Sequence, residues 1–448
     1  MEKVAIVGGG LVGAMQAVYM AEKGYHVDVY ERREDIRNAL FVAGKSINLA
    51  LSDRGWEALR KINMEGEIRK IAIPMRGRKI HNIDGSQHFQ AYGIEDQSIW
   101  SVSRGGLNQR LLIKADSFSN CNLYFNHKCL DLDLETNTLT FEFNNSHVKA
   151  SYDRVIGTDG AFSAVRTRLE RTERFNYSQT YLEHGYKELL IPASDNGLHQ
   201  IDPNSLHIWP RGGFMLIALA NLDGSFTVTL FMPFEGDVSF EKLQSDNDIE
   251  DFFSREFPDA LSIMPDLIND FKNNPTASLV TVKTYPWNYK DKVLLMGDAA
   301  HAIVPFYGQG MNCGFEDCSV LDDLMNEHLN DWSKIAPEYT QMRKANGDAI
   351  ADLALRNYIE MRDLTAQPDF LLRKEIEGLF TKRHPDKWLP LYSQVTFSHI
   401  PYSKAVKNAQ IQDKIMDEVM AMEDIEKKWN SQEVEHFILQ RLDKVNVI

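Results

Sequence analysis

The stretch Lys3-Val4-Ala5-Ile6-Val7-Gly8-Gly9-Gly10-Leu11-Val12-Gly13 decides the fold that the sequence predicts. Its apolar start predicts a short buried strand, and the residues from Val12 to Lys23 predict a helix. A second strand is expected at Val27–Tyr30, directly before Glu31. This order of strand, glycine turn, helix and strand is typical of the first unit of a doubly wound, mostly parallel sheet.

The spacing Gly8-x-Gly10-x-x-Gly13 has the form of a dinucleotide-binding fingerprint. The first glycine allows a tight turn, the second lets the backbone approach a pyrophosphate, and the third lets helix and strand pack closely. Glu31 follows about 20 residues later, where a carboxylate can accept hydrogen bonds from ribose hydroxyls. The spacing alone could be a glycine-rich turn without a ligand. With the strand, the helix and the acid in place, it predicts FAD or NAD rather than NADP.

Two later segments favour FAD over NAD. Residues 153–166 and 292–301 each contain a strand that ends in a small residue and an aspartate, Asp159 and Asp298. Asp298 can accept a hydrogen bond from a flavin ribityl hydroxyl. Gly308-Gln309-Gly310-Met311-Asn312 then opens a helix whose amides could face the flavin pyrimidine ring. Each segment alone could be a helix cap after a strand, but all three in this order predict a flavoprotein.

The remaining sequence predicts an interleaved organisation. Helices are expected at 54–70 and 101–117, and an antiparallel sheet within 180–232. Helices are also expected after residue 314, with breaks near Pro337, Pro368, Pro385 and Pro390. We expect an α/β fold with three parts. They are a discontinuous FAD-binding domain (1–73, 98–178 and 278–345), a β-rich substrate domain (74–97 and 179–277) and a helical C-terminal region (346–448).

Composition excludes several classes of protein. The 448 residues carry 49 Lys and Arg against 64 Asp and Glu, a net charge of −15, which disfavours nucleic acid as a partner. Four cysteines without a Cys-x-x-Cys motif indicate free thiols in a reducing compartment. No apolar run approaches the ~18 residues needed to span a bilayer. We therefore expect a soluble, cytoplasmic protein without a membrane anchor or a metal site.

The three flavin motifs together resemble those of the group A flavin monooxygenases, which are aromatic hydroxylases with one FAD domain. Along nearly its whole length the chain is similar to the kynurenine 3-monooxygenase family. The segments that carry this similarity are Lys45–Ser52, Pro74–Arg78, Leu206–Pro210, Ser225–Phe231, Val304–Asn312, Asn357–Met361 and Leu391–Ser398. The charged, amphipathic C-terminal sequence resembles that of the soluble bacterial members of this family rather than that of the membrane-anchored eukaryotic ones.

The resemblance implies a set of site residues. The implied cofactor contacts, added to Gly8, Gly10, Gly13, Asp159 and Gly310, are Val12, Tyr30, Glu31, Arg32, Arg33, Ala50, Arg104, Asp298, Met311 and Asn312. The implied substrate contacts are Arg78, Tyr92, Asn357 and Tyr392. A guanidinium such as that of Arg78 is a natural partner for the substrate carboxylate, although on residue type alone Arg78 could form a surface salt bridge.

The implied reaction is hydroxylation of L-kynurenine to 3-hydroxy-L-kynurenine with NADPH and O₂, in tryptophan degradation and the biosynthesis of NAD. Because FAD does the oxygen chemistry, we expect no side-chain nucleophile or base, and we interpret His301 as a packing residue. An apolar cover should exclude water, with Phe306, Tyr307 and parts of 206–231 as candidates. No second glycine fingerprint is present, so NADPH is expected to bind transiently.

Two alternatives stay open at this point. One is a group A hydroxylase that acts on a different aromatic acid. The other is a non-catalytic flavoprotein that binds an amino acid or a partner chain through its C-terminal helices. A homodimer is also compatible with the sequence.

Overall fold

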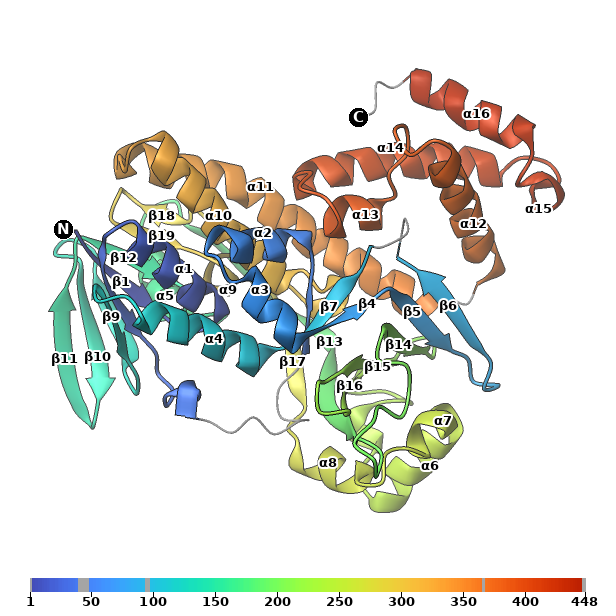
Figure 1. Cartoon of the computed structure of the whole chain (residues 1–448), viewed down its shortest axis with the longest axis horizontal. Coiled ribbons are helices and arrows are strands. Elements are labelled where there is room, and N and C mark those ends of the chain that lie inside the picture. The colour runs from blue at the N-terminus through green and yellow to red at the C-terminus, as the bar shows by residue number, and fades with distance from the viewer. Residues whose placement is uncertain (1, 39–47, 93–96, 365–366, 445–448) are drawn as a thin grey trace.

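Two large sheets, two small ones and the helices around them make up the computed structural model, which describes residues 2–38, 48–92, 97–364 and 367–444 (Figure 1). In these residues a six-stranded sheet has the order β18-β19-β12-β1-β2-β8. Its strands are β18 (Asn288–Tyr289), β19 (Val293–Leu295), β12 (Arg154–Gly157), β1 (Lys3–Val7), β2 (His26–Tyr30) and β8 (Cys121–Tyr124). All neighbours pair in parallel except β18 with β19. The predicted α/β fold class is confirmed.

This strand order places a ligand crevice. Along the chain, the strands run outward from β1 through β2 to β8, and the chain then returns to the other side of β1 with β12. In doubly wound sheets a ligand binds outside the carboxyl ends of the strands where the order reverses. Here that point lies between β1 and β12, at the glycine turn before α1 (Leu11–Glu22).

The second large sheet has seven strands in the described residues, in the order β17-β13-β16-β15-β14-β5-β6. Its strands are β17 (Ala277–Tyr285), β13 (Asn176–Ile191), β16 (Phe226–Pro233), β15 (Met215–Ala220), β14 (Ser205–Pro210), β5 (Gly77–His81) and β6 (Gln87–Ala91). The sheet is antiparallel as predicted except that β14 and β5 pair in parallel. Sequence patterns that identify β-hairpins could not predict this pair, because its two strands are joined by a long connection rather than by a turn.

Both faces of the sheet are covered at β15 and β16, which explains why these two strands are mostly apolar. Leu216, Val228 and Leu230 point to one face and pack in a core with helices α6 (Asp246–Glu256), α7 (Pro258–Leu261) and α8 (Leu267–Asn273). Met215, Ile217 and Phe231 point to the other face and line a cavity. The alternation follows from the two-residue period of a strand.

Two small sheets and the remaining helices complete the structure. The small sheets are β11 (Ser146–Ser151), β10 (Thr138–Phe143) and β9 (Lys128–Asp133), and β3 (Asn48–Leu51), β7 (Ile99–Ser103) and β4 (Ala72–Met75). The helices that cover the first sheet or follow it include α2 (Asp53–Lys61), α3 (Glu65–Ile68), α4 (Arg104–Asp116), α5 (Ala164–Leu169), α9 (Asp298–His301), α10 (Gly310–Glu327) and α11 (Trp332–Ile359). The C-terminal ones are α12 (Pro368–Arg383), α13 (Leu391–Thr396), α14 (Tyr402–Met420), α15 (Ile425–Lys428) and α16 (Gln432–Asp443), which group together in Figure 1.

Three predicted helix boundaries were wrong. The helix expected at 54–70 ends at Lys61, because Asn63 adopts a positive φ of 58° and stops it. The helix expected from residue 101 begins at Arg104, since 99–103 form the central strand of a small sheet. The break expected at Pro337 lies earlier, at Leu329 and Asn330, which both have positive φ. Pro337 is accommodated inside α11.

Candidate functional site

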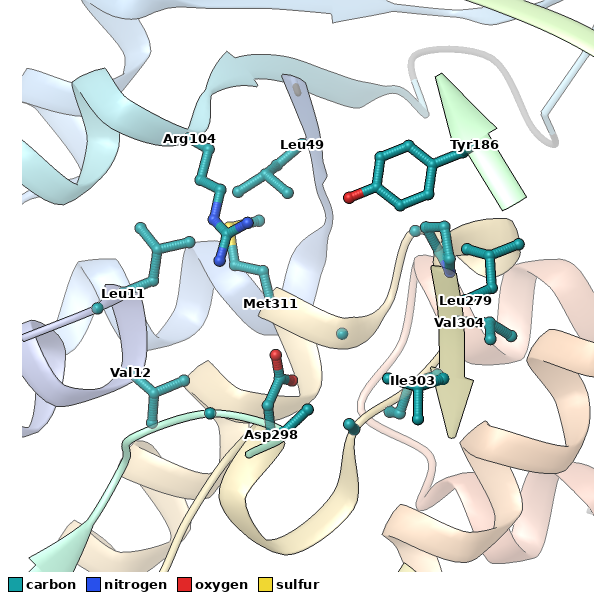
Figure 2. Close-up of a pocket in the computed structure, with 18 of the residues that line it drawn as sticks. Leu11, Val12, Leu49, Arg104, Tyr186, Leu279, Asp298, Ile303, Val304 and Met311 are labelled. Carbon is teal, nitrogen blue, oxygen red and sulfur yellow. The ribbon is translucent and has the colours of Figure 1, made fainter. Parts of the chain in front are cut away.

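A cavity of about 630 Å³ lies where the two large sheets meet. It begins at the glycine turn after β1, crosses the carboxyl ends of β2 and β12, and ends against one face of the seven-stranded sheet. Figure 2 shows part of its lining, with side chains from α1, α4, α10 and the segment 303–304 directed into one space.

The glycine turn is shaped by close backbone approach. Gly8 has a φ of 106°, and a Cβ there would lie 2.5 Å from the carbonyl oxygen of Thr158. A Cβ on Gly13 would lie 1.9 Å from the carbonyl oxygen of Gly8. Gly10 differs, because its φ is −70° and a Cβ there would meet no described atom within 4 Å. The first and third glycines are thus required by the protein itself, whereas the second faces open space in the cavity.

The N-terminus of α1 has free hydrogen-bond donors. Gly10 is its N-cap and supplies no side-chain acceptor for the first turn. The first backbone N–H groups of a helix have no partner within the helix and carry part of its positive dipole charge. A helix end of this kind beside a cavity favours a pyrophosphate.

Glu31 holds the turn and faces the cavity. Its Oε2 accepts a hydrogen bond from the N–H of Gly9 at 2.9 Å, and its Oε1 accepts two from Arg33, from the backbone N–H at 3.0 Å and from Nε at 2.8 Å. Burial acts to raise the pKa of Glu31, but the donors on Arg33 and Gly9 outweigh it and lower that pKa. The carboxylate is therefore ionised and can still accept bonds from ribose hydroxyls.

Replacement of Arg33 by alanine should make cofactor retention more sensitive to acid. A carboxyl with a lowered pKa contributes stability above its unfolded value, and that contribution is lost as the pH falls through the folded value. Without Arg33 the folded pKa of Glu31 rises, so release of FAD on acidification should begin at a higher pH. Flavin fluorescence during a pH titration measures this release. Arg32→Ala is the control, because Arg32 lines the same cavity without a bond to Glu31; an equal shift in both variants would contradict the explanation.

Asp298 and Arg104 face each other across the middle of the cavity (Figure 2). Burial raises the pKa of Asp298, and the positive charge of Arg104 acts against that rise. Asp159 lines the cavity too, but its carboxylate caps α5 by accepting bonds from the Ser163 hydroxyl and from the N–H of Ala164 at 2.7 Å. Asp298 is thus the carboxylate with more freedom to accept a bond from a ligand.

The loop before α10 brings a second helix N-terminus to the cavity. Gly308 adopts a φ of 67°, which turns the chain so that Gly310 and Met311 line the space. Asn312 does not line it; its buried amide donates to the carbonyls of Ala50 and Gly308, both at 2.8 Å, and accepts from the N–H of Ser52. Asn312 therefore fixes the loop from behind.

Arg78 lies at the boundary between this cavity and a second one of about 620 Å³. Its guanidinium carbon is 4.9 Å from the ring centroid of Tyr392 and 5.6 Å from that of Tyr92. The rings of Tyr92 and Tyr392 are stacked at 5.1 Å, and those of Tyr392 and Tyr307 at 5.6 Å. Three tyrosines from distant segments thus form one stack beside a buried arginine.

This arginine has unused donor capacity. Arg78 is 8% exposed, no carboxylate of the described residues lies within salt-bridge distance, and its Nε has no hydrogen-bond partner there. The hydroxyl of Tyr92 is also buried, and the positive charge of Arg78 acts on it. Glu360 lines the second cavity with Arg78, and its negative charge acts on the guanidinium without forming a salt bridge. A buried guanidinium without a directly paired anion is costly, so the arrangement fits a carboxylate ligand.

The comparisons with known proteins agree with this geometry. Residues 1–354 match the family model of the FAD binding domain. The kynurenine 3-monooxygenase of Flavobacterium johnsoniae is 51% identical over 99% of this chain and 99% of its own length. The chain belongs to the kynurenine 3-monooxygenase family. The kynurenine 3-monooxygenase of Sus scrofa is 45% identical over 92% of this chain and 88% of its own.

Solved structures with the same fold are more distant than these kynurenine 3-monooxygenases. A tetrameric form of 2-methyl-3-hydroxypyridine-5-carboxylic acid oxygenase has a TM-score of 0.67 at 18% identity, covering 82% of this chain and 94% of its own. A variant of Klebsiella pneumoniae HpxO complexed with FAD has a TM-score of 0.66 at 19% identity, covering 82% and 92%. The fold is that of the group A flavin monooxygenases. Within the described residues, no helix is both long and apolar enough to cross a bilayer.

As a member of the kynurenine 3-monooxygenase family, the protein has FAD as its cofactor, and the first cavity fits this group. The open space at Gly10, the uncapped N-terminus of α1 and the ionised Glu31 suit a pyrophosphate and a ribose. Of the predicted cofactor residues, those that line the cavity are Gly8, Gly10, Val12, Tyr30, Glu31, Arg32, Arg33, Ala50, Arg104, Asp159, Asp298, Gly310 and Met311. Gly13 and Asn312 lie behind it.

The predicted substrate residues divide between the two cavities of this kynurenine 3-monooxygenase family member. Arg78 and Tyr392 line both, whereas Tyr92 and Asn357 line only the second. The amide of Asn357 donates to the carbonyl of Phe306 at 2.7 Å and contacts the Met361 sulfur at 3.2 Å, so its nitrogen holds the protein rather than a ligand.

The wall of the first cavity contains residues that the sequence did not single out. Leu206, Met215, Ile217, Leu219 and Phe231 fall inside the range 206–231, in which an apolar cover was expected. Tyr186, Leu279 and Ile303 were not predicted (Figure 2). Strand periodicity shows which residues share a face, but not which face meets the cofactor. Residues 45–47, which begin one of the segments similar to the family, and residues 93–96, in the predicted substrate domain, lie outside the described residues.

Proposed function

We propose that this protein hydroxylates L-kynurenine to 3-hydroxy-L-kynurenine with NADPH and O₂, which also yields NADP⁺ and water. The observation that carries the proposal is the buried Arg78, which forms no salt bridge among the described residues and lies beside Tyr92 and Tyr392, next to the cofactor cavity. Kynurenine has a carboxylate for that guanidinium and an aromatic ring for the apolar part of the first cavity.

We infer that Arg78 binds the substrate carboxylate through two parallel hydrogen bonds. Burial raises the pKa values of Tyr92, Tyr307 and Tyr392, so their phenols stay neutral and can act as donors. We infer that Tyr92 and Tyr392 add hydrogen bonds to the same carboxylate and that Asn357 supports Phe306 beside them.

The reaction also requires a site from which water is excluded, and the apolar residues that line the first cavity support this. Bound FAD supplies the redox and oxygen chemistry, and NADPH is its transient reductant. Phe306 stacks on Tyr358 at 3.8 Å and meets Phe231 at 5.0 Å, so it is held against the sheet wall. We propose that Phe306, Tyr307, Met215, Ile217 and Phe231 hold the substrate ring in a dry space next to the flavin.

We further infer that the segments 74–97 and 179–277 together form a substrate domain. Strands β5 and β6 come from the first segment and β13 to β16 come mainly from the second, yet they share one sheet. The same sheet presents Arg78 and the apolar wall, which supports the assignment of substrate binding to it.

Rapid-mixing measurements of flavin reduction test the proposed reaction. NADPH should bleach the bound flavin slowly alone and much faster with L-kynurenine, and 3-hydroxykynurenine should accumulate in air. Acceleration by a hydroxybenzoate but not by kynurenine would instead identify a hydroxylase of another aromatic acid. A flavin that NADPH never bleaches would indicate a binding protein.

A further inference from the structure

A buried network of charged side chains lies behind α10, on the side away from the cofactor cavity. Asp317 is fully buried, and its Oδ2 accepts from His301 Nε2 at 2.6 Å and from the N–H of Gly297 at 3.0 Å. Its Oδ1 accepts from Arg343 Nε at 2.7 Å. Burial acts against the charge of His301, but Asp317 outweighs it and raises the pKa of His301 well above its ordinary value. The network is thus ionised.

Asp317, His301 and Cys313 offer ligand atoms within 4.8 Å of one another, a spacing that a metal ion could use. Both oxygens of Asp317 are already bonded, however, and Arg343 places a positive charge 3.3 Å from the sulfur of Cys313. A cation would meet both that charge and the protonated His301. The cluster is therefore a set of ion pairs that fixes the position of Gly297, the residue directly before Asp298.

Arg54 extends this network to the C-terminal helices. Arg343 Nη1 donates to Glu316 Oε2 at 2.6 Å, and Arg54 Nη1 donates to the other oxygen of Glu316. The Nε of Arg54 donates to the carbonyl of Val395 at 3.2 Å, and its Nη2 donates to the carbonyl of Ile400. The side chain has no exposed surface, and its guanidinium carbon is 3.9 Å from the ring centroid of Tyr402.

The partners of Arg54 belong to two different parts of the site. Val395 lies on α13, the short helix that carries the predicted substrate contact Tyr392. Glu316 lies on α10, whose N-terminus borders the cofactor cavity. A second link runs in parallel, because the hydroxyl of Tyr402 donates to Gln309 Oε1 at 3.0 Å, and Gln309 is the N-cap of α10. One buried side chain therefore joins the substrate helix to the flavin-facing helix.

We propose that Arg54 is a positioning residue that makes reduction of the flavin depend on the bound substrate. Contact of the substrate with Tyr392 fixes the position of α13. The hydrogen bond from Arg54 to Val395 then couples this position to α10, because Arg54 also binds Glu316, which Arg343 holds in place. The inference rests on the proposed function, since it takes kynurenine as the ligand beside Tyr392. It concerns the linkage between sites, not the chemistry itself.

The test compares Arg54→Met, Arg54→Lys and Lys61→Met with the unmodified FAD-loaded protein. Methionine keeps an unbranched apolar stem but has neither the guanidinium nor a donor, whereas lysine keeps the charge and part of the donor capacity. Lys61 is the matched control, because it also joins α2 to α10, through Asp323 at 2.6 Å, but does not reach α13. For each protein one measures the rate of flavin reduction by NADPH with and without kynurenine, the FAD content and the melting temperature.

The ratio of the two reduction rates is the decisive quantity. We expect Arg54→Met to lower this ratio by about tenfold or more, mainly through the rate with kynurenine, as is typical when a coupling between two sites is removed. Arg54→Lys should restore part of it and Lys61→Met should leave it unchanged. Product formation per NADPH consumed should fall in Arg54→Met, with H₂O₂ accounting for the difference.

Three outcomes would overturn the inference or its basis. An unchanged ratio in FAD-loaded Arg54→Met would show that Arg54 does not link the sites. Equal loss of FAD and of thermal stability in both Arg54 variants, with the ratio preserved in the loaded fraction, would assign Arg54 a structural role only. If kynurenine fails to accelerate reduction in the unmodified protein, the proposed function is wrong, which is a separate failure.

Discussion

Replacement of Arg78 by alanine is expected to weaken kynurenine binding by about 2–4 kcal/mol, roughly 30- to 800-fold in Kd, while the FAD content stays normal. The guanidinium is buried beside two stacked tyrosine rings and forms no salt bridge in the described residues, so the substrate would supply its directly paired counter-charge. Removal of one member of a buried charge pair leaves the other without a partner in a dry site.

The neighbouring residue provides a matched control for this prediction. Lys79 follows Arg78 on β5, and successive side chains on a strand point to opposite faces of the sheet. Lys79→Ala should therefore leave the Kd of kynurenine unchanged. Arg78→Lys keeps the charge but loses the planar fork, so its Kd for kynurenine should fall between those of the unmodified protein and Arg78→Ala. Titration of flavin absorbance with kynurenine measures all three.

Loss of FAD or of folding in Arg78→Ala would contradict this account and give Arg78 a structural role. That outcome has a physical basis to test, because the arginine also contacts both rings of the Tyr92 and Tyr392 stack. The binding of kynurenine analogues without a carboxylate distinguishes a role of Arg78 in carboxylate recognition from a structural role. Such analogues should bind the alanine variant and the unmodified protein with similar Kd values if Arg78 recognises only the carboxylate.

The cofactor half of the site was predictable from sequence because its chemistry is local. The glycine turn, the helix after it and Glu31 lie within the first β-α-β unit, so spacing alone places them together. The structure shows Gly8 and Gly13 in the close contacts that the fingerprint requires. Asp159 lines the cavity and also caps α5, so the helix-cap alternative is confirmed and the cofactor contact stays a prediction.

The substrate half could not be assembled from the residues without the family resemblance. Tyr92, Tyr307 and Tyr392 form one stack, yet they come from three segments that are far apart in the sequence. The parallel pairing of β5 with β14, which brings Arg78 beside Leu206, joins strands that no turn connects. Such contacts depend on the packing of whole elements, which periodicity does not reveal.

The network around Arg54 was missed for a related reason. The sequence Asp53-Arg54 at a helix start resembles many exposed helix ends, and charged residues are seldom fully buried. Its partners Glu316 and Ile400 are 262 and 346 residues away along the chain. Two of the three helix boundaries that were wrong have a local cause instead, since positive φ at Asn63, Leu329 and Asn330 stops helices where the apolar pattern alone would continue them.

The second large effect is expected at the glycine turn, where Gly10→Ala and Gly13→Ala should fail in different ways. In Gly13→Ala the new methyl group would lie 1.9 Å from the carbonyl oxygen of Gly8 and 2.6 Å from Thr158 Oγ1, so strand and helix must separate. Overpacking of a closed site costs about 1–3 kcal/mol or more. We expect lower thermal stability without added FAD, together with loss of the cofactor.

In Gly10→Ala the methyl group meets no described atom within 4 Å, and the φ of −70° suits alanine. The apoprotein should therefore keep its melting temperature. FAD binding should still weaken by about 1–3 kcal/mol, roughly 5- to 150-fold, because the methyl group occupies the space that the pyrophosphate needs. Gly66→Ala, another glycine with open space around it, should change neither quantity. If Gly10→Ala binds FAD as tightly as the unmodified protein, the pyrophosphate does not lie at this turn, because only a bound group can make that open position intolerant of a methyl.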